Sequence, residues 1–98
     1  MSERTGVFWD DLRDANPEAV IFDGPGAKTL FDPCIVGYAS RINQSPVLVY
    51  DEEKMIVTLC REENMSYNDA VDYLSFNTFG AWVGEGTPLI LRAYRGGA

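Results

Sequence analysis

Carboxylates are the side chains with which this chain could do chemistry, and they are concentrated in residues 51–72. That segment holds seven acidic and two basic residues, a net charge of −5. One interpretation is that the acids lie on two solvated helix faces, where they favour the positive helix N-termini. The other is a docking surface for a basic protein, because complementary charge speeds association and disfavours wrong partners. At the extreme, such a surface imitates a row of DNA phosphates and competes with DNA for its binder.

Two aromatic residues are candidates for anchoring a protein partner to this surface. Tyr67 begins the second of two predicted helices, and Trp82 lies in the stretch FNTFGAWVGEGTP, residues 76–88. Tryptophan is enriched at interface hot spots but is also often largely buried. We therefore expect Trp82 either in the core or against a partner. The predicted partner-binding residues are Glu52, Glu53, Glu62, Glu63, Tyr67, Asp69, Asp72 and Trp82.

Carboxylates elsewhere in the chain suggest an alternative, a small-ligand binder or a carboxylate-dependent enzyme. The candidates are Asp23, Asp32 and Glu85, together with the loop around Trp82. Hydrolysis by two carboxylates requires that they lie about 5–9 Å apart, in environments that separate their pKa values. A concave pocket that joins these residues would favour this alternative. Wide separation on a convex surface would exclude it.

Other kinds of chemistry are disfavoured by the residue types and spacings of the chain. There is no histidine, which removes the commonest general base and zinc ligand and excludes Ser-His-Asp and Cys-His catalysis within the chain. Gly84 and Gly86 match neither phosphate-binding glycine motif. Asp11 and Asp14 have an i, i+3 spacing with which two carboxylates can approach Mg²⁺, but no metal-loop motif accompanies them. We therefore expect a non-enzymatic protein with no cofactor and no metal site.

Charge and hydropathy narrow the set of partners. The net charge is −7 and the isoelectric point is about 4.3, so direct nucleic-acid binding and anionic membranes are disfavoured, since both need clustered Lys and Arg. No apolar run approaches the ~18 residues that span a bilayer, and the start MSERTGVFWDD does not resemble a secretory signal. Cys34 and Cys60 lie in apolar runs, which favours buried thiols of a cytosolic protein over a disulfide or redox pair.

The hydrophobic pattern predicts one α+β domain over residues 1–98, with a flexible N-terminal arm over about 1–17 and a C-terminal tail over 95–98. We expect a small antiparallel sheet of about four strands with two consecutive helices packed on it, in the order β-β-β-α-α-β. The expected strands cover residues 18–22, 30–42, 47–50 and 87–94. The second and third strands should form a hairpin, with a bulge or a close backbone approach at Gly37.

Both predicted helices have a residue that can cap the N-terminus. Asp51 precedes the first, and Ser66 precedes the second with Asp69 three residues later, so each side chain can accept a hydrogen bond from a free N–H of the first turn. Apolar residues recur at helical spacing behind both caps. The apolar faces are Met55, Ile56, Leu59 and Cys60 in the first helix and Tyr67, Ala70, Val71 and Leu74 in the second.

Two stretches, CIVGYASRINQSPVLVYDEEKMIVTL (residues 34–59) and MSYNDAVDYLSFNTFGAWVGEGTP (residues 65–88), together carry a fairly specific pattern. Its parts are an IVG strand, a PV pair, a YD helix start followed by a lysine, an MS helix start, FN at a helix end, and then GAWVG and TP. In this pattern the chain resembles a family of small acidic proteins carried by phages and bacterial genomes. The resemblance implies no particular activity. It implies a phage or mobile-element setting, in which small acidic proteins often bind and block a host protein.

From the charge and the resemblance we predict a small, non-enzymatic module that binds a protein with a basic surface in the cytoplasm of a bacterial host. The narrower prediction is a phage-encoded inhibitor of a host defence complex such as a CRISPR effector, an anti-CRISPR-like role in which acidic side chains compete with nucleic acid. A third possibility is a self-associating structural or accessory phage protein. A short sheet leaves edges that a second copy can pair with, which makes a homodimer possible.

Overall fold

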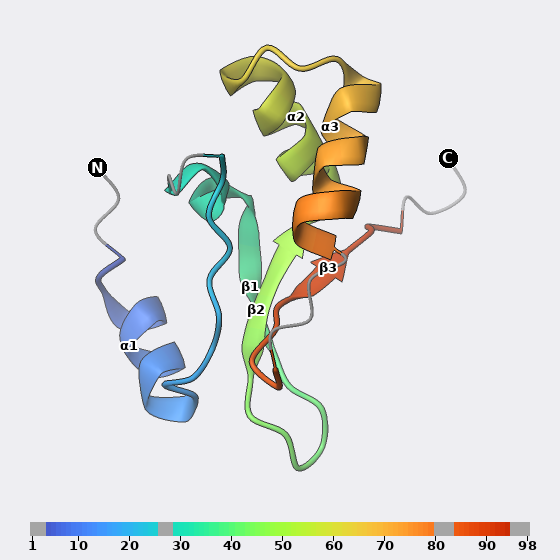
Figure 1. The fold of residues 1–98 in the computed structure, drawn as a ribbon. Coiled ribbons are helices and arrows are strands. Elements are labelled where there is room, and N and C mark those ends of the chain that lie inside the picture. Colours follow the sequence, from blue (N-terminus) through green and yellow to red (C-terminus); the bar gives the residue numbers. More distant parts are fainter. Residues whose placement is uncertain (1–3, 26–28, 80–83, 95–98) are drawn as a thin grey trace.

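The computed structural model describes residues 4–25, 29–79 and 84–94, which form a three-stranded sheet with accompanying helices (Figure 1). In chain order the elements are helix α1 (Val7–Ala15), the 3-10 helix η1 (Thr29–Cys34), strands β1 (Ile35–Ala39) and β2 (Val47–Asp51), helices α2 (Glu52–Glu62) and α3 (Tyr67–Leu74), the π-helical turn η2 (Ser75–Phe79) and strand β3 (Leu89–Leu91). The predicted α+β class is confirmed.

Strands β1 and β2 form the predicted antiparallel hairpin. Tyr38 lies opposite Leu48 in its ladder, and the register shifts between Ile35 and Gly37. The predicted bulge at Gly37 is therefore present. Its φ of 155° is a backbone angle that residues with a side chain rarely adopt, which explains why glycine stands at this position.

The sheet differs from the prediction in the number and direction of its strands. Three strands are present in the described residues, in the order β1-β2-β3, where about four were expected. β3 runs parallel to β2, with Val49 opposite Leu89 and Asp51 opposite Leu91. The chain passes through α2 and α3 between these two strands, and such a crossover brings the next strand in parallel. The sheet is therefore mixed rather than antiparallel.

The segment 18–22, expected as a strand, crosses the molecule without belonging to the sheet. The N–H of Val20 donates to the carbonyl of Gly86 at 3.0 Å, and the N–H of Phe22 donates to the Tyr50 hydroxyl at 2.9 Å. These are single bonds to two different elements rather than a ladder. The apolar residues that suggested a strand instead pack against the core, as Phe22 does on the ring of Tyr50 at a centroid distance of 5.2 Å.

Two other predicted strands are shorter than expected. The segment 30–42 begins in η1, and only Ile35–Ala39 is a strand. Pro33 suits the helical turn because its φ is fixed near the helical value and it has no N–H to contribute to a ladder. The last strand, expected over 87–94, is reduced to Leu89–Leu91.

Both predicted N-caps are confirmed, and they fix where the two helices begin. The Asp51 carboxylate accepts from the N–H of Lys54 at 3.0 Å, and the Ser66 hydroxyl accepts from the N–H of Asp69 at 3.1 Å. Figure 1 shows α2 leaving the end of β2 and α3 returning toward the sheet. The two helices stand together at one end of the sheet, so their outer faces form a surface of their own.

One cluster of buried side chains holds these elements together. The N-terminal segment expected as an arm contains α1, and Leu12 on that helix is only 2% exposed. Burying each large apolar side chain contributes about 1.5–3 kcal/mol. The members of the cluster are Leu12, Phe31, Cys34, Leu48, Tyr50, Met55, Ile56, Leu59, Ala70 and Leu74. The C-terminal tail over 95–98 lies outside the described residues.

Replacing Gly86 with alanine is expected to destabilise the fold by about 1–3 kcal/mol, the usual effect of overpacking. Gly86 is buried, and a Cβ built on it would overlap the backbone carbonyl oxygen of Glu18. That carbonyl belongs to the crossing segment, which is bonded to Gly86 through Val20. Urea denaturation measures the change, with the exposed neighbour Glu85→Ala as control. Equal stability of Gly86→Ala and Glu85→Ala would contradict the close approach.

Stability is expected to fall at high pH because two buried groups lose protons when the chain unfolds. Burial raises the pKa of the Tyr50 phenol and of the Cys34 thiol. The hydrogen bond between Cys34 and Thr58 lowers the pKa of the thiol, but by less than burial raises it. A raised folded pKa contributes stability that is fully present below the unfolded pKa and is lost as the pH rises through the folded pKa. For a thiol the loss begins near pH ~8.5.

We expect the free energy of unfolding to fall between about pH 8.5 and about pH 10.5, by up to about 1.4 kcal/mol per pH unit for each group whose unfolded form has ionised. Urea denaturation at intervals across this range measures the slope. Cys34→Ala should remove the part of the decline that begins first. A free energy that stays constant over the range would show that neither group is held in its neutral form.

Candidate partner-binding surface

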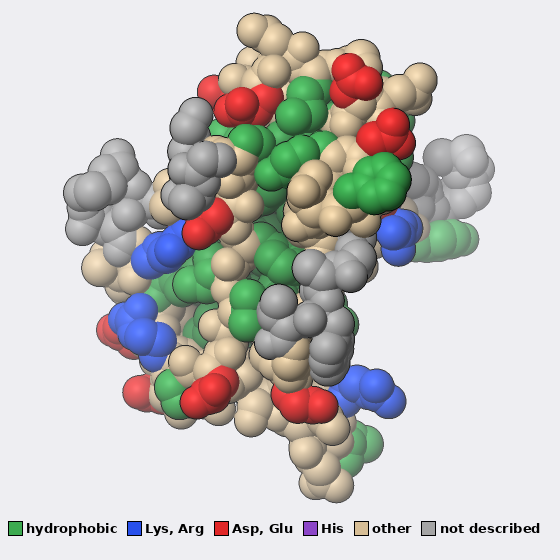
Figure 2. All heavy atoms as spheres, in the orientation of Figure 1, with side chains coloured by type: hydrophobic (Ala, Val, Ile, Leu, Met, Phe, Trp, Pro, Cys, Tyr) green, Lys and Arg blue, Asp and Glu red, His purple; other side chains and the backbone are tan. Residues whose placement is uncertain are grey.

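The predicted acidic residues lie on the pair of helices at the end of the sheet. We call Glu52, Glu53, Glu62, Glu63, Asp69 and Asp72 the acidic helical surface. Two of them begin α2, two lie at its end, and two lie on α3. Glu52 and Glu63 are half-buried, and the other four are exposed. Figure 2 shows acidic side chains over α2 and α3, with hydrophobic side chains between them.

Tyr67 lies within this surface, beside the acids at the start of α2. Its side chain is 54% exposed, although the helical spacing had also placed it on the apolar face of α3. The pKa of its phenol is raised, first by the negative charge of Glu53 and further by the charge of Glu52. An aromatic ring flanked by carboxylates can meet a cation through its face while the acids pair with the same cation.

Ion pairs compensate part of the negative charge. Arg92 contacts Glu52 at 3.1 Å, and Arg61 contacts Glu62 at 2.9 Å. Both arginines are well exposed, with 67% and 62% of their side-chain surface accessible, so these pairs contribute little to stability. Exposed pairs of this kind can exchange partners when another charged surface approaches.

Trp82 lies outside the described residues, so the prediction that its side chain is in the core or against a partner stays a prediction. Other apolar side chains are exposed that no sequence pattern predicted to be so. Phe76 in η2 is 83% exposed, Val57 on α2 is 45% exposed, and Ile42 in the hairpin loop is 92% exposed. Exposed aromatic and aliphatic groups are the usual centres of protein interfaces.

The carboxylates expected for an enzyme are brought together only in part. Arg4 joins Asp32 and Asp23, with its guanidinium 2.8 Å and 3.2 Å from their oxygens. Glu85 instead lines a separate hollow of about 590 Å³ together with Glu18 and the hairpin loop. The best-formed hollows of the described residues do not join Glu85 to the two aspartates. This arrangement gives the enzyme alternative no observation in its favour.

The remaining candidates for chemistry are carboxylates that could bind a metal ion and the two thiols. Among the residues that the structure describes, no group of three or more Cys, Asp and Glu side chains could hold a metal ion. Asp10, next to the predicted pair Asp11 and Asp14, forms a salt bridge with Arg13 at 2.6 Å. Both cysteines are free thiols, Cys34 buried and Cys60 half-buried.

Comparisons of the chain with models of protein families, with curated proteins and with solved structures give no match. None of the helices in the described parts of the chain has the length and apolar character needed to cross a bilayer. The interpretation of function therefore depends on the surfaces of the molecule itself.

Proposed function

We propose that the protein is a small, non-enzymatic module that binds a protein partner with a basic surface through the acidic helical surface. The observation that carries this proposal is the exposed Tyr67 beside Glu53 and Glu52, on helices with an excess of acid. Aromatic residues in a charged surround are typical anchors of protein interfaces. The charge around the anchor selects a basic partner and accelerates the encounter.

The setting that we propose is a bacterial cytoplasm, where the protein, encoded by a phage, inhibits a host defence complex. The support is the sequence resemblance to small acidic phage and bacterial proteins together with the charge of the acidic helical surface. A CRISPR effector is one such complex, since it holds nucleic acid in positively charged channels. An acidic surface that occupies a channel of this kind competes with nucleic acid without binding nucleic acid itself.

Affinity capture from a bacterial lysate, followed by mass spectrometry, tests the proposal. The test compares the wild-type protein with a variant that carries lysine at Glu62, Glu63, Asp69 and Asp72. We expect the wild type to retain a protein with a basic surface and the variant to lose it.

The matched control for this capture reverses an equal number of exposed acids elsewhere. Asp11, Asp14, Glu18 and Glu85 are all exposed and lie outside the acidic helical surface, so replacing them with lysine produces the same net charge. The control should still retain the partner. Equal loss from both variants would show that net charge, rather than the acidic helical surface, decides binding.

Self-association is a second candidate, favoured by exposed apolar groups on the sheet. Leu89 and Leu91 lie on one face of β3 and are 47% and 40% exposed, and Val36 on β1 is 46% exposed. The net charge of −7 opposes association between copies. We expect the mass of one chain in analytical ultracentrifugation at physiological salt. The mass of two chains would favour this second candidate.

A further inference from the structure

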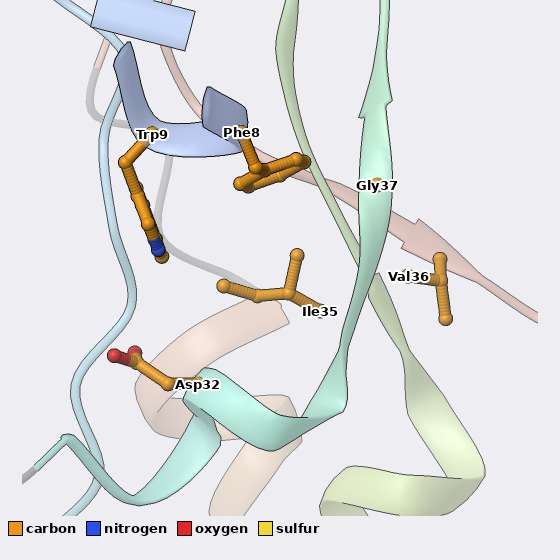
Figure 3. Close-up of a pocket in the computed structure, with 6 residues that line it drawn as sticks. All are labelled: Phe8, Trp9, Asp32, Ile35, Val36 and Gly37. Carbon is orange, nitrogen blue, oxygen red and sulfur yellow. The ribbon is translucent and has the colours of Figure 1, made fainter. Parts of the chain in front are cut away.

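A slot lies between α1 on one side and η1 and β1 on the other. Its volume is about 280 Å³, and it is lined by Phe8, Trp9, Asp32, Ile35, Val36 and Gly37. Figure 3 shows Trp9 and Phe8 descending from α1, with Ile35 facing them from the strand side. The indole nitrogen of Trp9 points toward Asp32 at the far end. The slot therefore has apolar walls and one carboxylate.

The aromatic walls of the slot are held at fixed angles to one another. The rings of Phe8 and Trp9 lie 5.3 Å apart at 89°, and Phe8 packs on Tyr38 at 5.4 Å with a tilt of 41°. Phe8 and Trp9 are half-buried, and Tyr38 is 40% exposed. Half-buried aromatic rings of this kind can meet an ammonium group through a ring face.

The carboxylate of the slot belongs to a cluster with excess negative charge. Arg4 donates to both oxygens of Asp32, at 2.8 Å and 3.1 Å, and also to Asp23 at 3.2 Å. One guanidinium therefore serves two carboxylates. Arg4, Asp32 and Asp23 together carry a net charge of −1, and this favours a cation at the slot.

We propose that this slot binds a lysine or arginine side chain of the basic partner, as a second contact point besides the acidic helical surface. This inference depends on the proposed function for the identity of the partner, but its chemistry follows from the slot. The alkyl stem of the side chain would lie along Ile35 and the aromatic walls. The cation would face the ring of Trp9 and the carboxylate of Asp32, where cation–π attraction and charge act together.

Two short peptides test the chemistry directly. They share the sequence Gly-Gly-Xaa-Gly-Gly, with lysine or its uncharged counterpart norleucine at the third position. Two-dimensional NMR follows the Trp9 indole N–H signal, which is assigned by its disappearance in Trp9→Phe. We expect the lysine peptide to shift this signal and to bind about 3- to 30-fold more tightly than the norleucine peptide. Equal binding of the two peptides, or no shift with either, would overturn the proposal.

Opposite charges on the strand beside the slot provide a matched pair of variants. Val36 is 46% exposed, and Figure 3 shows its side chain on the side of β1 away from Trp9, so either charge can be placed there without filling the slot or disturbing the core. Val36→Lys should weaken binding of the lysine peptide at least about 3-fold, and Val36→Glu should strengthen it, because the local potential changes in opposite directions. An identical effect of the two variants would contradict a cationic occupant.

The experiments test the slot inference and the proposed function independently. The variant with lysine at Glu62, Glu63, Asp69 and Asp72 leaves the slot intact and should keep its preference for the lysine peptide over the norleucine peptide. If the peptides show no preference while partner capture still depends on the acidic helical surface, the slot inference is wrong and the proposed function stands. If the preference holds but capture is indifferent to the four reversals, the proposed function is wrong.

Discussion

Lysine at Glu62, Glu63, Asp69 and Asp72 is expected to weaken partner binding about 10- to 100-fold while the fold stays intact. Each of the four carboxylates attracts a basic surface, whereas a lysine at the same position repels it. Most of the loss should appear in the association rate, since exposed charges act chiefly by steering the encounter. Surface plasmon resonance with the captured partner separates the two rate constants.

The four reversals should have little effect on stability. Asp69 and Asp72 are exposed, and the pair that Glu62 makes with Arg61 is exposed on both sides. The largest single effect is expected at Asp69, because a lysine in the first turn of a helix opposes the helix dipole at about 0.3–1 kcal/mol. Thermal denaturation followed by circular dichroism checks that the variant is folded. Unchanged affinity in a folded variant would move the partner surface elsewhere.

The largest expected effect on stability is that of Phe31→Ala, a loss of about 3–5 kcal/mol. Phe31 is fully buried in the core cluster. It lies on η1, which packs against α2 and β2. Removal of the ring leaves a cavity where three elements meet, and a small domain has only about 5–15 kcal/mol of stability in total. Urea denaturation measures the loss.

The same substitution at an exposed phenylalanine is the control. Phe76 is 83% exposed in η2, so Phe76→Ala should change stability by less than about 0.5 kcal/mol. A large loss of stability for Phe76→Ala together with a small loss for Phe31→Ala would show that Phe76 is the buried ring, and this would contradict the fold.

The features that were predicted well are those that neighbouring residues determine. Asp51 and Ser66 cap their helices because each side chain reaches an N–H three residues away. The bulge at Gly37 is likewise local, since only glycine takes its backbone angle readily. The α+β class followed from these elements and their order.

Features that depend on distant contacts were not predictable. The segment 18–22 has the composition of a strand, but its bonds go to Gly86 and to the Tyr50 hydroxyl. The parallel direction of β3 depends on how α2 and α3 return the chain to the sheet, which no pattern within 87–94 reveals.

The candidate site likewise has a part that was predictable from neighbouring residues and parts that depend on distant contacts. Acids spaced along two amphipathic helices had to be exposed, so the acidic helical surface was foreseeable. Its anchor was less so, because Tyr67 falls on the apolar spacing of α3 and is nevertheless 54% exposed. The slot between α1 and β1 joins Trp9 to Asp32 across more than twenty positions of the chain, and no sequence pattern connects them.

The dependence of partner affinity on ionic strength tests the central claim most directly. Exposed charge pairs are screened once the Debye length falls below their separation. For the wild-type protein we predict that affinity falls steeply as salt rises from about 50 mM to about 500 mM, and that the slope is smaller for the variant with lysine at Glu62, Glu63, Asp69 and Asp72. An affinity that is the same throughout this range would contradict binding through the acidic helical surface.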